Sequence, residues 1–211
     1  MVLKLIMKNL KDIILERLHI NKDTGNHDHH YNYHPKTIDE LKELVYRLIK
    51  ERGNDADLND IDTSEITDMN FMFYESPFNG DISNWDVSNV KDMSHMFYKS
   101  KFNGDISNWD VSKVINMEGL FLYSLFNGDI SNWDVSNVKD MTYMFYGSDF
   151  NGDISHWDVS NVKNMDCMFY ESKFTSKNGD ISNWDVNNVK NMHMMFDKSP
   201  LEKNPPKWYK N

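Results

Sequence analysis

Apolar residues recur along this chain with a period of 24 residues. Five near-identical copies open with Phe-Asn-Gly-Asp or, in the last copy, with the same motif interrupted by Thr175-Ser176-Lys177. A degenerate copy at residues 57–77 keeps the frame, with Ile61 at the tryptophan position. A fixed period in the twenties indicates stacked units, so we predict an array of about six turns. The tryptophans that mark the copies are Trp85, Trp109, Trp133, Trp157 and Trp184.

Within one copy the apolar spacing changes from that of a strand to that of a helix. Trp85 and Val87 stand two apart, which places them on one face of a short strand, with Asn84 and Asp86 on the other. After Ser88, a candidate N-cap, the apolar residues follow helical steps. Each strand follows the last after a whole crossover, so the strands are expected to stack in parallel. We therefore predict an α/β repeat solenoid with a short parallel strand and a short helix in each turn.

The segments outside the array predict caps at both ends. Thr37-Ile38-Asp39-Glu40 is a capping box, and the apolar face that follows it runs to Gly53, which indicates a helix. A helix directly before the array would cover the apolar edge of the first turn. The expected organisation is an amphipathic helix, a polar His-rich linker, an N-terminal capping helix, the array and a C-terminal cap: residues 1–20, 21–36, 37–53, 54–200 and 201–211.

Charge and composition narrow the possible partners. The net charge is −10, and residues 57–77 carry six acids and no base. Because an acidic array repels phosphate, nucleic acid is not an expected partner. No apolar stretch reaches the ~18 residues of a membrane span, and charges interrupt the first 20 residues where a signal peptide would need an apolar core. These features favour an intracellular protein without membrane insertion.

Two outward columns form the candidate binding site. On the predicted strand face, stacking aligns an amide column beside a carboxylate column, which would present an acidic, hydrogen-bonding strip to a protein or glycan partner. The alternative is structural, since amides can bond from turn to turn and an aspartate before a helix can cap its amides. The candidate residues are Asn84, Asp86, Asn108, Asp110, Asn132, Asp134, His156, Asp158, Asn183 and Asp185.

Metal chemistry has two weaker candidates. The acids after each Asn-Gly corner, such as Asp81 and Asp105, offer oxygen ligands for calcium, but an aspartate is ordinary there in a turn. The imidazoles of residues 27–34 offer ligands for a transition metal, but a loose linker does not fix a geometry. Catalytic motifs are absent, and Cys167, the single cysteine, has no histidine placed by motif to activate it. We expect a non-enzymatic protein with neither cofactor nor metal.

The spacing Trp-Asp-Val-Ser-Asn-Val-x-x-Met-x-x-Met-Phe, with Phe-Asn-Gly-Asp at the start of each copy, resembles the repeats of BspA-type leucine-rich-repeat surface proteins. The resemblance covers Asp57 to about Pro200. It implies a right-handed leucine-rich-repeat solenoid with a role in binding or adhesion and no enzymatic activity. The chain departs from the surface-protein pattern because it has no signal peptide or lipid-anchor cysteine near its start, although the family is often secreted or on the cell surface.

Two functions remain open at this point. The first is a monomeric scaffold that binds a protein or glycan partner. The second is a structural spacer that assembles through the helix expected at residues 1–20. Within the first, the uniform strand face competes with positions that differ between copies, such as the column that reads Phe71, His95, Gly119, Tyr143, Cys167 and Met194. Differing residues would discriminate a specific partner better than a uniform column does.

Overall fold

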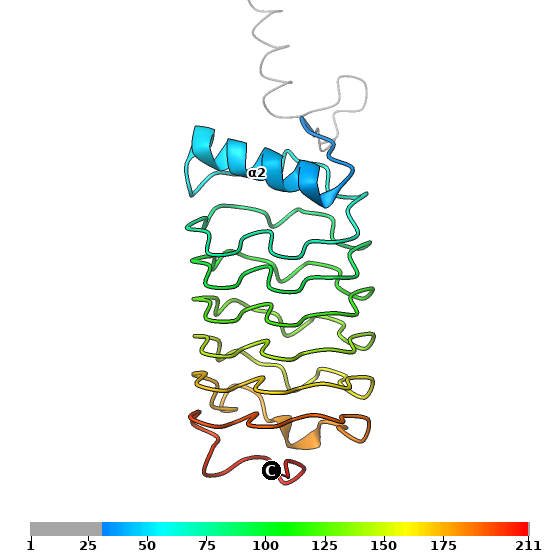
Figure 1. Cartoon of the computed structure of the whole chain (residues 1–211), viewed down its shortest axis with the longest axis vertical. Helices are drawn as coiled ribbons and strands as arrows, with labels where there is room; N and C mark the ends of the chain where they lie inside the picture. Colours follow the sequence, from blue (N-terminus) through cyan, green and yellow to red (C-terminus); the bar gives the residue numbers. More distant parts are fainter. Residues whose placement is uncertain (1–30, 211) are drawn as a thin grey trace, which may run out of the picture.

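The computed structural model describes residues 31–210, which form a stack of similar turns beneath one helix (Figure 1). Each turn of chain lies over the next along the long axis, and the C-terminal end closes the opposite end of the stack. The helix expected at residues 1–20, and most of the linker expected at 21–36, lie outside the described residues.

Helix α2 (Ile38–Arg52) lies across the first turn and begins at the N-cap Thr37 that the sequence predicts, although Glu40 reaches back to Lys36 and not to Thr37 (Figure 1). The Thr37 hydroxyl accepts a hydrogen bond from the Glu40 amide at 3.3 Å, and the Glu40 carboxylate accepts one from the Lys36 amide at 2.7 Å. Gly53, with φ of 96°, ends the helix. Its apolar face is buried in the continuous core of the stack, through Leu41, Leu44, Val45 and Leu48. Within residues 31–210, no helix combines the length and the apolar character that a membrane crossing requires.

The interior consists of columns of identical rings. Phe97 and Phe121 are parallel to within 4°, with their centroids 5.6 Å apart, and both are fully buried. A second column runs beside the first, with Phe102 and Phe126 separated by 6.4 Å. Residues 24 apart therefore lie over one another, as the repeat predicts. The two columns comprise Phe73, Phe97, Phe121, Phe145, Phe169 and Phe196, and Phe78, Phe102, Phe126, Phe150 and Phe174.

The buried tryptophans tie each turn to the one before it. The Trp109 indole N–H donates to the carbonyl of Ile82 in the preceding turn at 3.2 Å, and every later copy repeats this bond. After the last repeat, Trp208 donates to the carbonyl of Ile181 at 2.9 Å and stacks on Trp184. Because a buried carbonyl without a partner destabilises a fold, this tail residue completes the interior of the last turn.

The predicted fold class, an α/β repeat solenoid with a strand and a helix in each turn, is wrong. In residues 31–210 the only α-helix is α2, and the only other helical piece is the 3-10 turn η1 (Ile181–Asn183). Pairing between turns is limited to isolated parallel bridges with no continuous strand, such as Asp92 with Asn116 and Asn116 with Asp140. Each turn therefore consists of short β-turns joined by segments without regular secondary structure.

The expected strand fails because corners interrupt it. The Trp85 amide donates to the Ile82 carbonyl and the Val90 amide donates to the Val87 carbonyl, so two β-turns occupy the segment that alternates in sequence. Strand-like alternation over so few residues does not distinguish a strand from a pair of tight turns, since both place Trp85 and Val87 inward.

The expected helix does not form, because two residues in each turn, four positions apart, have positive φ. His95 and Lys99 have φ of 55° and 48°, in the left-handed region that an α-helix excludes. Amides of alternate residues then point along the stack, so that those of Phe97 and Lys99 donate to the carbonyls of Leu120 and Leu122 in the next turn at 2.9 and 2.8 Å. These bonds between turns replace the bonds that a helix would make within itself. Consecutive β-turns give the same apolar spacing as a helix.

Candidate functional site

All ten residues of the predicted strip are exposed. Their backbone is a pair of turns instead of a strand, and the aspartates take part in those turns. The Asp110 Oδ1 atom accepts a hydrogen bond from the Ser112 amide at 3.0 Å, which is the geometry of an Asx turn. Asp86, Asp134, Asp158 and Asp185 accept the equivalent bond.

Hydrogen bonding favours the ionised form of two of these carboxylates, Asp110 and Asp158. Bonds from the side chain and amide of Ser112 lower the pKa of Asp110, and bonds from Ser160 lower the pKa of Asp158 in the same way. A general acid or base that works near neutral pH needs a pKa close to 7, and these groups shift in the opposite direction. The sequence left open whether these aspartates serve the fold or a ligand. One oxygen of each aspartate serves the fold by accepting the turn hydrogen bond, and the column still presents negative charge at the surface.

The second acidic column has the same turn chemistry. Asp105 and Asp129 accept hydrogen bonds from the amides of Ser107 and Ser131, each at 2.9 Å. No group of three or more histidine, cysteine, aspartate or glutamate side chains in the described range, 31–210, is arranged to hold a metal ion. The calcium hypothesis has no support from these residues, and the histidines at 27–30 lie outside the described range.

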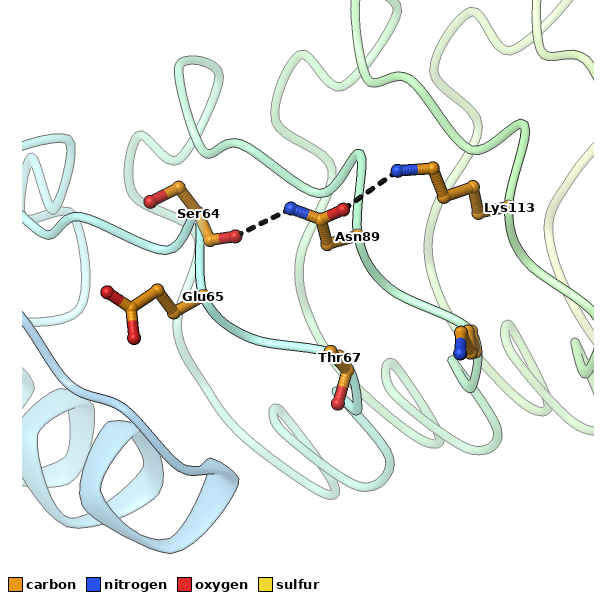
Figure 2. A pocket seen from close by; sticks show the side chains of 6 residues that line it. Ser64, Glu65, Thr67, Asn89 and Lys113 are labelled. Carbon is orange, nitrogen blue, oxygen red and sulfur yellow. Dashed lines mark hydrogen bonds between the residues drawn. The ribbon is translucent and has the colours of Figure 1, made fainter.

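A shallow depression of about 520 Å³ lies at the first three turns of the stack, between Ser64 and Lys113 (Figure 2). Asn89 bridges it, because its side-chain amide donates to the Ser64 carbonyl at 2.9 Å and accepts from Lys113 Nζ at 2.8 Å. Its other lining residues are Glu65, Thr67 and Lys91. The depression offers donors and acceptors to a polar ligand.

Lysines line the same side of the stack. The Lys163 amide donates to the Lys139 carbonyl, and the Lys190 amide donates to the Lys163 carbonyl, both at 2.8 Å, so these residues lie in one column. Lys91 belongs to the same column two turns before Lys139, with Ile115 between them. The predicted strip therefore continues into a polar face of mixed charge. We use the name polar face for the ten strip residues together with Asn89, Lys91, Lys113, Lys139, Lys163 and Lys190.

A second surface, outside the ten predicted site residues, is aromatic. Tyr74 and Tyr98 stack with centroids 4.8 Å apart, Tyr123 meets Tyr146 edge to face at 5.1 Å, and Tyr146 stacks on Tyr170 at 4.7 Å. These contacts join rings from successive turns into one continuous network. We call it the aromatic strip, and it consists of Phe71, Tyr74, His95, Tyr98, Tyr123, Tyr143, Tyr146 and Tyr170.

Ion pairs flank the aromatic strip at both ends. Lys99 Nζ lies 3.2 Å from Glu75 Oε1 and also over the Tyr98 ring. Lys198 Nζ lies 2.8 Å from Glu171 Oε1 and over the Tyr170 ring. The strip thus has an aromatic centre with a charged pair toward either end, the general composition of a protein contact surface.

Comparison with known families decides the classification of the chain. The family model described as "Mycoplasma protein of unknown function, DUF285" matches residues 40–149 and, in a second match, residues 102–208. The chain belongs to the DUF285 family. Two overlapping matches are expected when one chain carries several near-identical copies, and together they run from within α2 to Trp208. No curated protein and no solved structure matches the chain.

Membership in DUF285 establishes a repeat family and does not specify the BspA type. The match therefore supports the tandem repeat found in the sequence, while the leucine-rich-repeat architecture expected from the resemblance is absent from residues 31–210.

The signal for the aromatic strip in this DUF285 chain was present in the sequence but was assigned to a helix. The column of differing residues, Phe71 to Met194, has positive φ throughout, and Phe71 and Tyr143 from this column are exposed. A second column of positive φ reads Glu75, Lys99, Tyr123, Gly147, Glu171 and Lys198. Positions that differ between copies therefore gather on one surface.

Cys167 lies in the first of these columns. Its thiol is partly buried and points to the His193 carbonyl, with the sulfur 3.6 Å from the oxygen. Burial raises the pKa of this thiol, which is the opposite of what a nucleophilic cysteine requires.

Proposed function

We propose that this DUF285 chain is a non-enzymatic scaffold that binds a protein or glycan partner through the polar face. The observation that carries the proposal is that different groups in each turn stabilise the fold and face the solvent. The core columns and the bonds between turns hold the backbone, while one oxygen of each strip aspartate, the strip amides, and lysines such as Lys91 and Lys163 remain at the surface. A rigid surface with repeated donors and acceptors loses little conformational entropy when it binds.

Two further observations support a binding function. The strip aspartates Asp110 and Asp158 have lowered pKa values, which suits recognition by charge better than proton transfer. The repeat consensus resembles that of BspA-type surface proteins, for which binding or adhesion is the expected role.

The structure allows charge to be removed without removing a turn. Asparagine forms the same Asx turn as aspartate, and the chain already uses it at Asn116, whose Oδ1 accepts from the Glu118 amide at 3.0 Å. The double variant Asp110→Asn/Asp134→Asn should therefore fold normally and lose two charges from the polar face. The matched control, Asp105→Asn/Asp129→Asn, loses two charges from a different corner of the same turns.

The test applies labelled full-length chain to a glycan array and to an array of purified proteins. We expect the wild type and the control variant to bind the same ligand, and the Asp110→Asn/Asp134→Asn variant to bind it about tenfold more weakly or worse. Equal binding by all three proteins would exclude the polar face. An equal loss in both variants would show that net charge, not this face, controls binding, and no bound ligand on either array would count against a binding scaffold.

A further inference from the structure

We propose that two copies of this chain associate in antiparallel orientation through the aromatic strip. The partner at this surface is a second copy, and the two-fold axis passes between the third and fourth turns of the repeat array. This inference goes beyond the proposed binding function, uses a different surface, and departs from the monomer expected from the sequence.

The first argument is where the exposed apolar surface lies. Among residues 31–210, seven large apolar side chains are exposed, and four of them belong to the aromatic strip: Phe71, Tyr74, Tyr123 and Tyr143. Large apolar patches on a protein surface mark contact sites more often than scattered single residues do. The ring contacts connect these exposed rings through the half-buried Tyr98 and Tyr146, and the network ends at Tyr170, which is buried.

The second argument concerns which surfaces of the rings are free. Tyr74 and Tyr98 are stacked at an angle of 17°, and Tyr146 and Tyr170 at 21°, so that each ring covers a face of its neighbour. A sugar binds an aromatic side chain mainly against the ring face, whereas a protein surface can pack against ring edges and hydroxyls. The stacked rings therefore favour a protein partner over a glycan.

The order of charged residues along the strip indicates that the protein partner is a second copy of this chain. Read along the stack, the second column of positive φ has Glu75 and Lys99 at one end and Glu171 and Lys198 at the other. When this column is laid against a reversed copy of itself, Glu75 faces Lys198 and Lys99 faces Glu171, so that opposite charges meet at all four positions. In a parallel pair whose two-fold axis follows this column, each residue would face its own like charge. A two-fold interface requires a surface that is complementary to itself, and the antiparallel arrangement meets that condition.

The centre of the same column is apolar and small. Reversal places Tyr123 of one copy opposite Gly147 of the other. Within one copy, a Cβ atom at Gly147 would lie only 2.4 Å from the Tyr123 ring. The Tyr123 ring thus overlies Gly147 within each copy, and the two Tyr123 rings meet at the axis of the dimer. Reversal of the first column likewise sets Tyr143 opposite Gly119.

The flanking charges do not oppose association. Lys99 with Glu75, and Lys198 with Glu171, are already paired within one copy, so the dimer joins two pairs into a cluster at each end. Six turns spaced by about 4.8 Å span about 24 Å, which gives an interface at the small end of the usual range, below ~1,200 Å² in total. The dimer is therefore weak and reversible.

Sedimentation equilibrium of the full-length chain over a wide concentration range tests association. We expect a monomer–dimer equilibrium that the double variant Tyr123→Ser/Tyr143→Ser weakens about tenfold or more. The control is Tyr46→Ser, which removes a tyrosine that is 73% exposed on α2, and it should leave the equilibrium unchanged. A wild type that stays monomeric throughout, or a dimer that the double variant does not weaken, would overturn the proposal.

Disulfide trapping tests the orientation. Reversal of the first column places His95 of one copy opposite Cys167 of the other, so His95→Cys should form a disulfide-linked dimer under mild oxidation. The two positions are three turns apart in one chain, about 14 Å, which is too far for an internal disulfide. Cysteine also fits the backbone at 95, because Cys167 holds the same left-handed conformation, with φ of 51° against 55°.

Two controls separate the possible registers. His95→Cys/Cys167→Ser lacks the opposing thiol and should remain uncrosslinked. The wild type, with Cys167 alone, should also remain uncrosslinked, whereas a parallel dimer whose axis follows the first column would join Cys167 to Cys167. Crosslinking of the wild type or of His95→Cys/Cys167→Ser, or no crosslinking of His95→Cys, would overturn the antiparallel arrangement. Neither readout depends on an external partner, so these results are independent of the proposed binding function.

Discussion

The interior columns and the aromatic strip are built from the same stretch of each turn, yet they follow opposite rules. Inside, the column through Phe97, Phe121 and Phe145 repeats one residue in every copy, and every ring is fully buried. Outside, the column that starts at Phe71 changes residue in every copy. A buried ring packs on its own equivalents above and below, so a different residue in one turn would disturb three turns. A surface residue has no such constraint.

The backbone makes this division possible at a cost. His95 and Lys99 take left-handed conformations, which cost on the order of 1 kcal/mol each for residues other than glycine. In return, their amides donate to the next turn at 2.8 Å, while Phe97 between them points into the core. The comparison teaches that bonds between turns and buried rings carry the fold, which leaves the outer positions free to differ.

The largest expected contrast between the two regions comes from removing one ring from each. Phe121→Ala deletes a ring that packs on Phe97, Phe126 and Phe145, and we expect it to lower the free energy of unfolding by about 3–5 kcal/mol. Tyr123→Ala, two residues later in the aromatic strip, should cost about 1 kcal/mol or less, because its side chain is 42% exposed. Urea unfolding at low protein concentration, followed by tryptophan fluorescence, measures both. Equal losses would show that the strip supports the fold as much as the core does.

The sequence predicted what depends on the period and failed where local geometry decides. The alignment of residues 24 apart and the N-cap at Thr37 are both present. The strand and the helix of each turn are not, because the positive φ of His95 and Lys99 has no signature in residues that ordinarily avoid it. Five copies of one pattern make the stacking of residues 24 apart easy to predict. They do not help to distinguish a helix from consecutive turns, because every copy has the same ambiguous spacing.

The candidate site was predicted to a similar extent. Exposure of Asn84, Asp86 and their equivalents follows from alternation alone, since either a strand or a pair of turns points Trp85 inward. The aromatic strip required knowledge of which side of the turn Tyr98 and Tyr123 share, and that depends on the left-handed residues between them. Whether the polar face binds a partner stays a prediction.

Acid should loosen the outer corners before it affects the interior. No ionisable side chain is among the buried polar residues of 31–210, whereas hydrogen bonds from Ser107 and Ser112 lower the pKa values of Asp105 and Asp110. A carboxyl whose pKa is lower in the folded state contributes stability above its unfolded pKa of about 3.8 and loses it as the pH falls through the folded value. We expect the melting temperature to be constant between about pH 5 and 7 and to fall below about pH 4. A melting temperature that rises below pH 4 would contradict this assignment.

The smallest effect isolates a single corner. Asp134→Ala removes the acceptor of the Ser136 amide, a bond of 3.0 Å at an exposed corner, and should cost about 1 kcal/mol. Asp134→Asn keeps an acceptor in the same place and should lower the free energy of unfolding by only about 0.3 kcal/mol, since asparagine also forms Asx turns. Thermal unfolding of the two variants at pH 7 compares them directly. If both variants lower the melting temperature equally, the negative charge of Asp134, and not its hydrogen bond, stabilises the corner. The same charge would then serve both the fold and the binding of a partner to the polar face.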